Sequence, residues 1–355
     1  MREEILDTLR CQQCLGKLSS AGGKLVCNNC RMAYPISEGL IFMGYDKNEK
    51  NEVEKRIATK RQLQVNLLDK IQLHYDFAYP SFKICQLSSR ILKHDIKKIN
   101  PIAIDIACGS TPMGKMLSES GFNAYRCELD PNFLYAGLRW KHFNLDIGKH
   151  IVCDATILPF RDNSVDVVFS KEFVHHLCDY DLLFMEINRV LKKDGIFLMI
   201  EPTSWILFSL TQKFAKEKGD PQHHYETINR YFSALKRTGF LPYRYYLYNY
   251  GSKRLKFLNM IKNSFHTQLY SMSKTSKVGL LLKMLVQRLI DGSSVVFSRK
   301  VENMPTYKER PKIEIIEPSR LVLDENYLND ARMEKFDEIL NDVYNDVYKR
   351  IPHFT

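Results

Sequence analysis

The sequence predicts an α/β protein built on one doubly wound parallel sheet, with a small metal-binding module before it and a helical tail after it. An apolar strand at residues 102–106 runs into a turn of small residues and then a helix-like segment. Further strands and helices alternate up to residue 301, and two Cys-x-x-Cys pairs stand near the N-terminus. A strand, a small-residue turn and a helix in succession bring the backbone of such a sheet close to a nucleotide-like ligand.

The composition is that of a soluble globular protein. The 355 residues can build one sizeable core and one or two small modules; 45% are hydrophobic and 26% are charged. The charged residues 1–10 predict no signal peptide, and Lys283 and Arg288 interrupt the most apolar segment, so no transmembrane segment is expected. An odd number of cysteines, nine, with four in a metal-type pattern, predicts a reducing cytoplasm and not a disulfide framework.

The net charge of +11 is unevenly distributed. Residues 206–300 carry 17 Lys and Arg against 4 Asp and Glu, whereas residues 301–355 carry 8 against 12. This pattern predicts either that the basic region binds a polyanion or an acidic substrate, or that it pairs with the acidic tail. A solvated basic surface would give the same composition.

Residues 1–45 predict a zinc ribbon. Cys11 and Cys14 form one Cys-x-x-Cys pair, and Cys27 and Cys30 form a second, with twelve residues between the pairs. Each pair turns two thiolates toward one point, and four thiolates complete a tetrahedral site that suits Zn²⁺. A site filled by four thiolates has no open position for a substrate, so the predicted role is structural, with redox use of the pairs as the alternative.

Residues 34–41, Tyr-Pro-Ile-Ser-Glu-Gly-Leu-Ile, predict the turn and short strand that close the ribbon. This ending resembles that of the small zinc-ribbon proteins that partner tRNA and protein methyltransferases. Residues 46–100 then predict a helical connector or lid, with two amphipathic helices separated near Tyr79 and Pro80. These helices are expected to cover the edge of the sheet or the mouth of its site.

The acids that follow the second and third predicted strands suggest a nucleoside site. Glu128 comes at the end of the second strand, 23 residues after Asp105, where an acid can accept hydrogen bonds from ribose hydroxyls. Asp130 is a weaker candidate, because Asp130 and Pro131 read as a turn and helix cap. Residues 151–153 predict a third strand that leads to Asp154, where an acid and a free backbone N–H can read the adenine edge.

The remaining elements complete the sheet. Residues 165–170 predict a buried fourth strand, and residues 186–195 an amphipathic helix that ends in a glycine turn. A strand at 196–200, a helix at 230–237 and strands at 241–250 and 294–301 follow, with an insertion at 251–292. The insertion includes an amphipathic helix with basic flanks, which suits a lid or packing helix, a dimer surface, or a docking face for a membrane or an acidic carrier.

Two motifs carry a second resemblance. Residues 154–166 follow the pattern D-A-x-x-L-P-F-x-D-x-S-x-D, and residues 189–195 follow R-V-L-K-x-x-G. With the elements above, residues 101–301 resemble the class I S-adenosylmethionine-dependent methyltransferases of the type 11-like branch. The resemblance implies a Rossmann-like seven-stranded methyltransferase sheet with an antiparallel last strand. It also implies that S-adenosyl-L-methionine binds at the carboxyl ends of the first four strands.

The resemblance also implies the residues that line the cofactor. Asp105, Ala107 and Gly109 are expected beside the methionine part, and Glu128, followed by Leu129, at the ribose. Asp154 and Ala155 are expected at the adenine, and Ser170 at the sulfonium end. The chain departs from the family at Ala107 and Thr111, which stand in place of glycine, and at Pro112. These residues narrow the turn and leave room for a different cofactor pose or weaker binding.

Methyl transfer asks the protein to hold the nucleophile in line, to exclude water and, for some acceptors, to remove a proton. Two histidine pairs are candidates for that proton: His175 and His176 after the fourth strand, and His223 and His224 before the next helix. A structural role is the alternative for the first pair. Glu201, at the end of the fifth strand, is expected to contact substrate.

The predicted function is S-adenosylmethionine-dependent methyl transfer to an O, N or C atom of a small molecule, in the cytoplasm. One alternative is an rRNA or tRNA base methyltransferase, because some rRNA guanine methyltransferases join a cysteine-rich zinc module to this fold and the positive charge suits phosphate. A second alternative is a scaffold that binds the cofactor without catalysis, and a third is a methyltransferase whose substrate is a protein. Residues 251–292 could support a homodimer, and residues 302–355 predict a tail whose helix docks on the catalytic domain.

Overall fold

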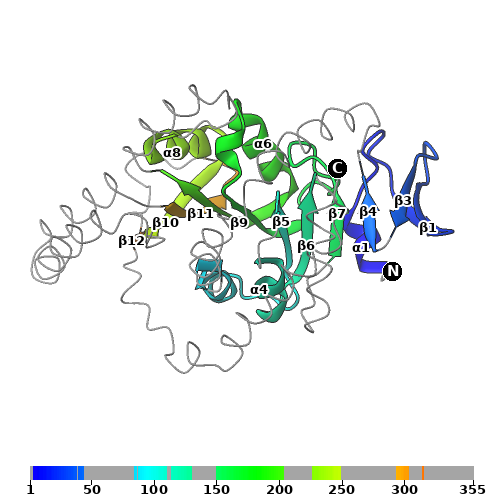
Figure 1. Ribbon diagram of the computed structural model, residues 1–355, viewed down its shortest axis with the longest axis horizontal. Helices are drawn as coiled ribbons and strands as arrows, with labels where there is room; N and C mark the ends of the chain where they lie inside the picture. Colours follow the sequence, from blue (N-terminus) through cyan, green and yellow to red (C-terminus); the bar gives the residue numbers. More distant parts are fainter. Residues whose placement is uncertain are drawn as a thin grey trace, which may run out of the picture.

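The computed structural model describes residues 3–37, 39–43, 84–85, 87–109, 113–129, 149–203, 226–248, 293–303 and 314–315. These residues form one long sheet with helices on both faces, and the N-terminal strands lie at one end of the molecule (Figure 1). The predicted α/β class is confirmed. The insertion at 251–292, the first connector helix and most of the C-terminal tail lie outside the described residues.

Seven strands form the centre of the sheet, in the order β7-β6-β5-β8-β9-β11-β10. Six of them are parallel, and β11 runs antiparallel to both of its neighbours, β9 and β10. The strands are β5 (Ile102–Ile106), β6 (Asn123–Glu128), β7 (Lys149–Val152), β8 (Val165–Lys171), β9 (Leu191–Pro202), β10 (Phe240–Tyr248) and β11 (Ser293–Lys300). The predicted seven-stranded arrangement with an antiparallel last strand is therefore present.

The complete sheet has twelve strands, five more than the sequence predicted. Four come from the N-terminal ribbon, which begins with helix α1 (Glu3–Thr8): β1 (Leu18–Ala21), β2 (Lys24–Cys27), β3 (Ala33–Ser37) and β4 (Leu40–Phe42). Strand β4 pairs in parallel with β7. At the other edge, β12 (Glu314–Ile315) pairs in parallel with β10. The ribbon is thus an extension of the sheet as well as a module.

Two apolar layers enclose the central strands. On one face, α6 (Tyr180–Val190) and α8 (Ile228–Arg237) pack with Phe184 and Tyr231 over Phe197. On the other face, residues 84–96 and α4 (Met113–Glu119) pack over the sheet (Figure 1). Neighbouring residues of β8 alternate between the layers, as the pleat of a strand requires, so both faces of the sheet are buried.

One predicted boundary is wrong. The helix expected to continue to the glycine turn at Gly195 ends at Val190, and β9 already begins at Leu191. Leu191 is fully buried and pairs with Val165, so tertiary strand pairing ends the helix before the local glycine signal. Gly195 instead allows the backbone to pass close to the Lys192 carbonyl oxygen, which would lie only 2.8 Å from a Cβ at this position.

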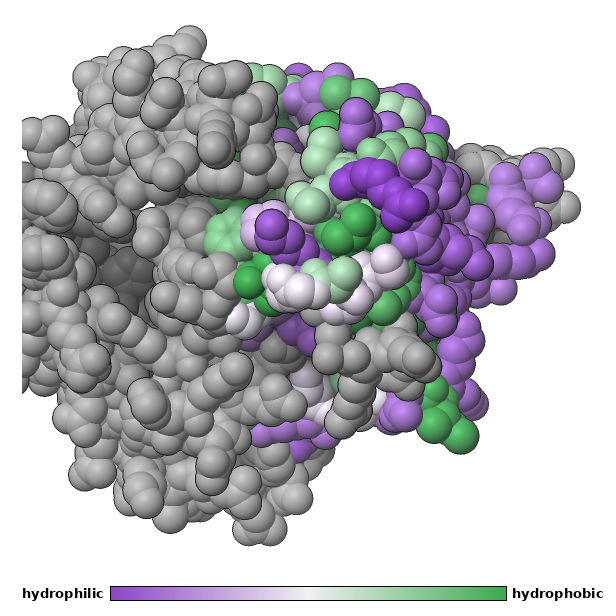
Figure 2. Space-filling model, turned by 90° about the vertical axis from the view of Figure 1, so that its right-hand side faces the viewer, coloured by the Kyte–Doolittle hydropathy of each residue, from purple (hydrophilic) through white to green (hydrophobic). Residues whose placement is uncertain are grey.

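The end of the molecule that carries the ribbon is shown in Figure 2, where hydrophilic residues predominate on the outer rim of the described surface. Three large apolar side chains near this end are exposed: Leu15, Met32 and Ile157. In the part of the chain that the structure describes, no helix is long and apolar enough to span a membrane.

Candidate cofactor site and metal centre

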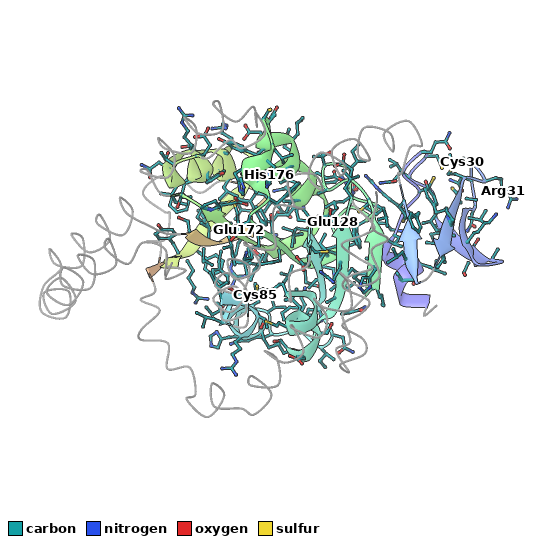
Figure 3. The ribbon with its side chains drawn as sticks, in the orientation of Figure 1. Cys30, Arg31, Cys85, Glu128, Glu172 and His176 are labelled. Atoms are coloured by element: carbon teal, nitrogen blue, oxygen red, sulfur yellow. The ribbon has the colours of Figure 1, made fainter. Side chains whose placement is uncertain are left out.

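Strands β5, β6 and β7 end side by side at one edge of the sheet. The strand order reverses between β5 and β8, and ligands of open α/β sheets bind in the crevice outside the strand ends at such a point. In Figure 3, Glu128 lies at the end of β6, close to the end of β5. Asp105, Ser170 and Glu201 each stand one residue before the end of β5, β8 and β9, respectively. The topology therefore gathers most of the predicted cofactor residues at one edge.

The turn after β5 is held to β6 by hydrogen bonds. Glu128 accepts one from the Gly109 N–H through Oε2, at 2.8 Å, and one from the Leu129 N–H through Oε1, at 2.8 Å. Ala107 has a φ of 46° and Gly109 a φ of 48°, both in the left-handed region that favours glycine. Alanine at the first of these positions costs about 1–2 kcal/mol of backbone strain, which the contacts to β6 offset.

Arg126, which sequence reasoning missed, fixes the same turn. Its side chain is 1% exposed and donates from Nη2 to the Gly109 carbonyl oxygen, at 2.9 Å. Gly114 in α4 gives it room, because a Cβ there would lie 2.7 Å from Arg126 Cγ. The sequence could have indicated this role, because Arg126 stands in the middle of a largely apolar strand and a buried guanidinium requires hydrogen-bond partners.

Glu128 suits a ribose. A carboxylate offers about four acceptor positions, so two backbone N–H contacts do not prevent it from accepting hydrogen bonds from hydroxyls. Ser170 is fully buried, and its Oγ has no hydrogen-bond partner among the residues that the structure describes. A buried hydroxyl in that condition is unfavourable, so Ser170, one residue before the end of β8, suits a polar ligand at the strand ends. The residues present thus fit a nucleoside-type cofactor.

The loop after β7 begins beside Glu128, because the Cys153 N–H donates to the Glu128 carbonyl oxygen, at 3.1 Å. Asp154 Oδ1 accepts from both the backbone N–H and the hydroxyl of Thr156, at 2.7 Å each. This oxygen closes the turn of the loop. Asp154 Oδ2 is then the oxygen that can meet an adenine edge, next to the buried Ala155.

His175 and Glu201, which the sequence analysis treated separately, form a buried pair. Their Nδ1 and Oε2 atoms share a hydrogen bond of 2.7 Å, and the two residues are 5% and 0% exposed. Glu201 Oε1 accepts from the N–H groups of Phe173 and Val174, at 2.9 and 2.8 Å. The centroid of the His176 ring lies 4.2 Å from that of the His175 ring, and the two ring planes are tilted by 35°. Both oxygens of Glu201 therefore contact the protein, and the expected contact between Glu201 and a substrate stays a prediction.

The pair could have been found from the sequence, because parallel neighbouring strands such as β8 and β9 end at the same edge and bring the residues after them together. His223 and His224 lie outside the described residues.

The ribbon gathers four thiols at its tip. The sulfur atoms of Cys11, Cys14, Cys27 and Cys30 all lie within 4.8 Å of one another. The residue after each pair, Leu15 or Arg31, has a φ of 62°, so both knuckles turn in the same way. Cys30 and Arg31 are labelled in the ribbon in Figure 3. Four thiols at this spacing are a donor set that suits Zn²⁺.

Backbone and tyrosine groups support these thiols. The N–H groups of Cys30 and Asn29 point at Cys27 Sγ and lower the pKa of Cys27 to about 6. The hydroxyl of Tyr34 lies 3.2 Å from Cys11 Sγ and accepts from the Gln12 N–H, at 2.9 Å. From the sequence, Tyr34 was expected only as part of a turn. Such outer contacts orient the ligands of a metal.

Comparisons with known proteins agree with this arrangement. Residues 104–199 match the family model described as "Methyltransferase domain", and residues 2–39 match the one described as "Trm112p-like protein". An uncharacterized protein of Methanocaldococcus jannaschii is 27% identical over 173 residues, which cover 47% of this chain and 65% of that protein. The demethylmenaquinone methyltransferase of Staphylococcus haemolyticus is 33% identical over 153 residues, covering 38% and 63%.

Among solved structures, one described as a putative sarcosine dimethylglycine methyltransferase from Galdieria sulphuraria aligns with a TM-score of 0.44 and 16% identity, covering 62% of this chain and 84% of that one. The chain spans less than two thirds of the length of the two curated relatives named above. Both resemblances found in the sequence are confirmed as similarities: residues 104–199 are similar to a methyltransferase domain, and residues 2–39 are similar to a Trm112p-like protein.

Proposed function

We propose that this protein transfers the methyl group of S-adenosyl-L-methionine to an O, N or C atom of a small molecule. The observation that carries the proposal is the joined edge of β5 and β6, where Glu128 holds the Gly109 turn at the ends of the strands. The match to a methyltransferase domain supports the reaction. The demethylmenaquinone methyltransferase relative, whose name gives a small-molecule acceptor, supports the substrate class.

The cofactor, when bound, supplies a methyl group activated by a sulfonium. The residues proposed to bind its methionine, ribose, adenine and sulfonium parts, in that order, are Asp105, Ala107 and Gly109, then Glu128 and Leu129, then Asp154 and Ala155, and finally Ser170. Buried strand ends hold these groups in fixed positions, which is what in-line displacement requires.

His175 is proposed to take the proton of a protic acceptor, with Glu201 as the residue that orients its ring. The support is their 2.7 Å hydrogen bond in a buried setting, the arrangement by which a carboxylate fixes the orientation of an imidazole. His223 and His224 remain candidates for the same role by their place in the sequence.

The other predictions carry over as parts of the proposal. A structural Zn²⁺ occupies the four thiols of the ribbon. The domains are the zinc ribbon at 1–45, the helical connector at 46–100, the catalytic domain at 101–301 and the tail at 302–355. The protein works in the cytoplasm, and residues 251–292 provide a homodimer surface.

RNA base methylation is the second candidate. The net charge of +11 suits a phosphate backbone, and the Trm112p-like segment resembles proteins that partner tRNA methyltransferases. Binding to RNA would then weaken steeply as salt is added.

The first test is calorimetric titration of the zinc-loaded full chain with S-adenosyl-L-methionine and its demethylated product. We expect binding by the wild type, weaker binding by Glu128→Gln, and no change for Glu302→Gln, an exposed ion-pair acid far along the sheet. Methyl transfer from radiolabelled cofactor into a small-metabolite extract, compared with total RNA, then separates the two candidates. Absence of binding by the wild type would overturn the proposal.

A further inference from the structure

The ribbon holds the loop that follows β7. We call residues 154–162 the adenine loop, since it begins with Asp154, beside the end of β6. In this loop, four successive carbonyl oxygens each accept a hydrogen bond from another part of the chain. Gln12 Nε2 donates to Ile157 at 2.8 Å, and the Arg10 N–H donates to Pro159 at 2.9 Å. Arg189 of α6 donates to the other two, at 3.0 and 2.8 Å.

The loop also donates hydrogen bonds to the ribbon. The Arg161 N–H donates to the Thr8 carbonyl oxygen at 2.9 Å, and its guanidinium donates to the carbonyl oxygens of Leu9 and Leu6, at 3.0 and 3.3 Å. These carbonyls belong to α1 and to the residue after it, where helical carbonyls lack partners within the helix. Arg10 bonds Asp162 at 2.8 Å. The ribbon and the loop are therefore one hydrogen-bonded unit.

Gln12 connects this unit to the metal ligands. It stands between Cys11 and Cys14, and its N–H donates to the Tyr34 hydroxyl that lies 3.2 Å from Cys11 Sγ. Its side chain reaches the adenine loop from the same turn. Gln12 therefore joins the Cys11–Cys14 knuckle directly to Ile157, next to the contact of Arg10 with Pro159.

We propose that Gln12 is a positioning residue for the cofactor, and that metal in the ribbon sets cofactor affinity by holding the adenine loop in place. The inference rests on the proposed function for the identity of the ligand. The loop lies beside Glu128, so a ligand that spans Glu128 and Asp154 requires both in register. Loss of the metal frees the knuckle, which has little apolar core of its own.

Gln13 provides a matched control. It is the same residue type, also stands between the two cysteines, and has an exposed side chain. We expect Gln12→Ala to weaken binding of the demethylated cofactor about 2- to 10-fold, the value of one net hydrogen bond. Gln13→Ala should match the wild type. Equal thermal midpoints for the two variants would show that the difference is not one of folding.

Hydrogen exchange of the protein without cofactor provides a second, independent readout. The backbone amides of residues 156–158, 160 and 161 should exchange faster in Gln12→Ala and after zinc is removed by a chelator, and not in Gln13→Ala. If the wild type binds cofactor but both variants bind it equally well and exchange alike, the inference is overturned. If the wild type binds no cofactor, the proposed function fails, and equal exchange of this loop in all three proteins would reject the coupling as well.

Discussion

Replacing Glu201 is expected to destabilise the protein more than any surface substitution, because three donors depend on one buried carboxylate. Its two oxygens receive the N–H groups of Phe173 and Val174 and share a hydrogen bond with His175. Glu201→Ala leaves these groups without that acceptor in a site where Glu201 is 0% exposed. Breaking a buried pair of this kind costs about 3–5 kcal/mol, which is roughly 6–20 °C in melting temperature for a domain of this size.

Glu201→Gln separates the hydrogen bonds from the charge. The amide oxygen can still accept from both backbone N–H groups, and its NH₂ can donate to a His175 tautomer that is protonated at Nε2. We therefore expect it to lose about 1–2 kcal/mol, less than half the cost of alanine. Thermal unfolding of the zinc-loaded chain followed by circular dichroism measures both, with Glu302→Ala at an exposed ion pair as the control. The reasoning is refuted if Glu201→Ala melts at the same temperature as that control.

Cys27→Ser should lower both the zinc content, from about one ion per chain, and the melting temperature, because four thiolates share the ion. Atomic absorption measures the zinc, and an unchanged zinc content would contradict the site. Burial raises the pKa of Asp166, but hydrogen bonds from two lysines and one backbone N–H outweigh it, so the net pKa is lowered. Its stabilisation is present above the unfolded pKa of about 3.9 and is lost as the pH falls through the folded value. Asp166→Asn should therefore cost about 1–2 kcal/mol at pH 7 in urea denaturation, and a deficit that persists in acid would argue against this. Gly239 has a φ of 84°, and a Cβ there would lie 2.7 Å from Asn188 Nδ2. Gly239→Ala should therefore lower the free energy of unfolding by about 1–3 kcal/mol in the same assay, and a neutral effect would show that the turn relaxes.

Local patterns predicted the elements that depend on local physics. The strand at residues 102–106 was predicted with its observed bounds, because a short apolar run ending in small residues has few alternatives. The four thiols were predicted from spacing alone, since a Cys-x-x-Cys turn fixes where its sulfur atoms point.

Long-range pairings were not predicted. Nothing near Leu40 indicates that it will pair with His150, more than a hundred residues later. The same is true of Leu191, whose pairing with Val165 ended a helix that the local sequence favoured. The role of Arg126 and the pairing of Glu201 with His175 were missed for this reason, because the contacts of buried charges depend on partners that only the fold supplies.

The parallel pairing of β4 with β7 has a consequence for how the protein withstands dilution. An uncovered β7 would present an edge strand whose unpaired backbone groups can pair with other chains. Here the covering strand belongs to the same polypeptide, so the pairing is intramolecular and does not depend on how concentrated the protein is. A cover supplied by a separate subunit would fall away at low expression levels, whereas this one stays seated at any protein concentration.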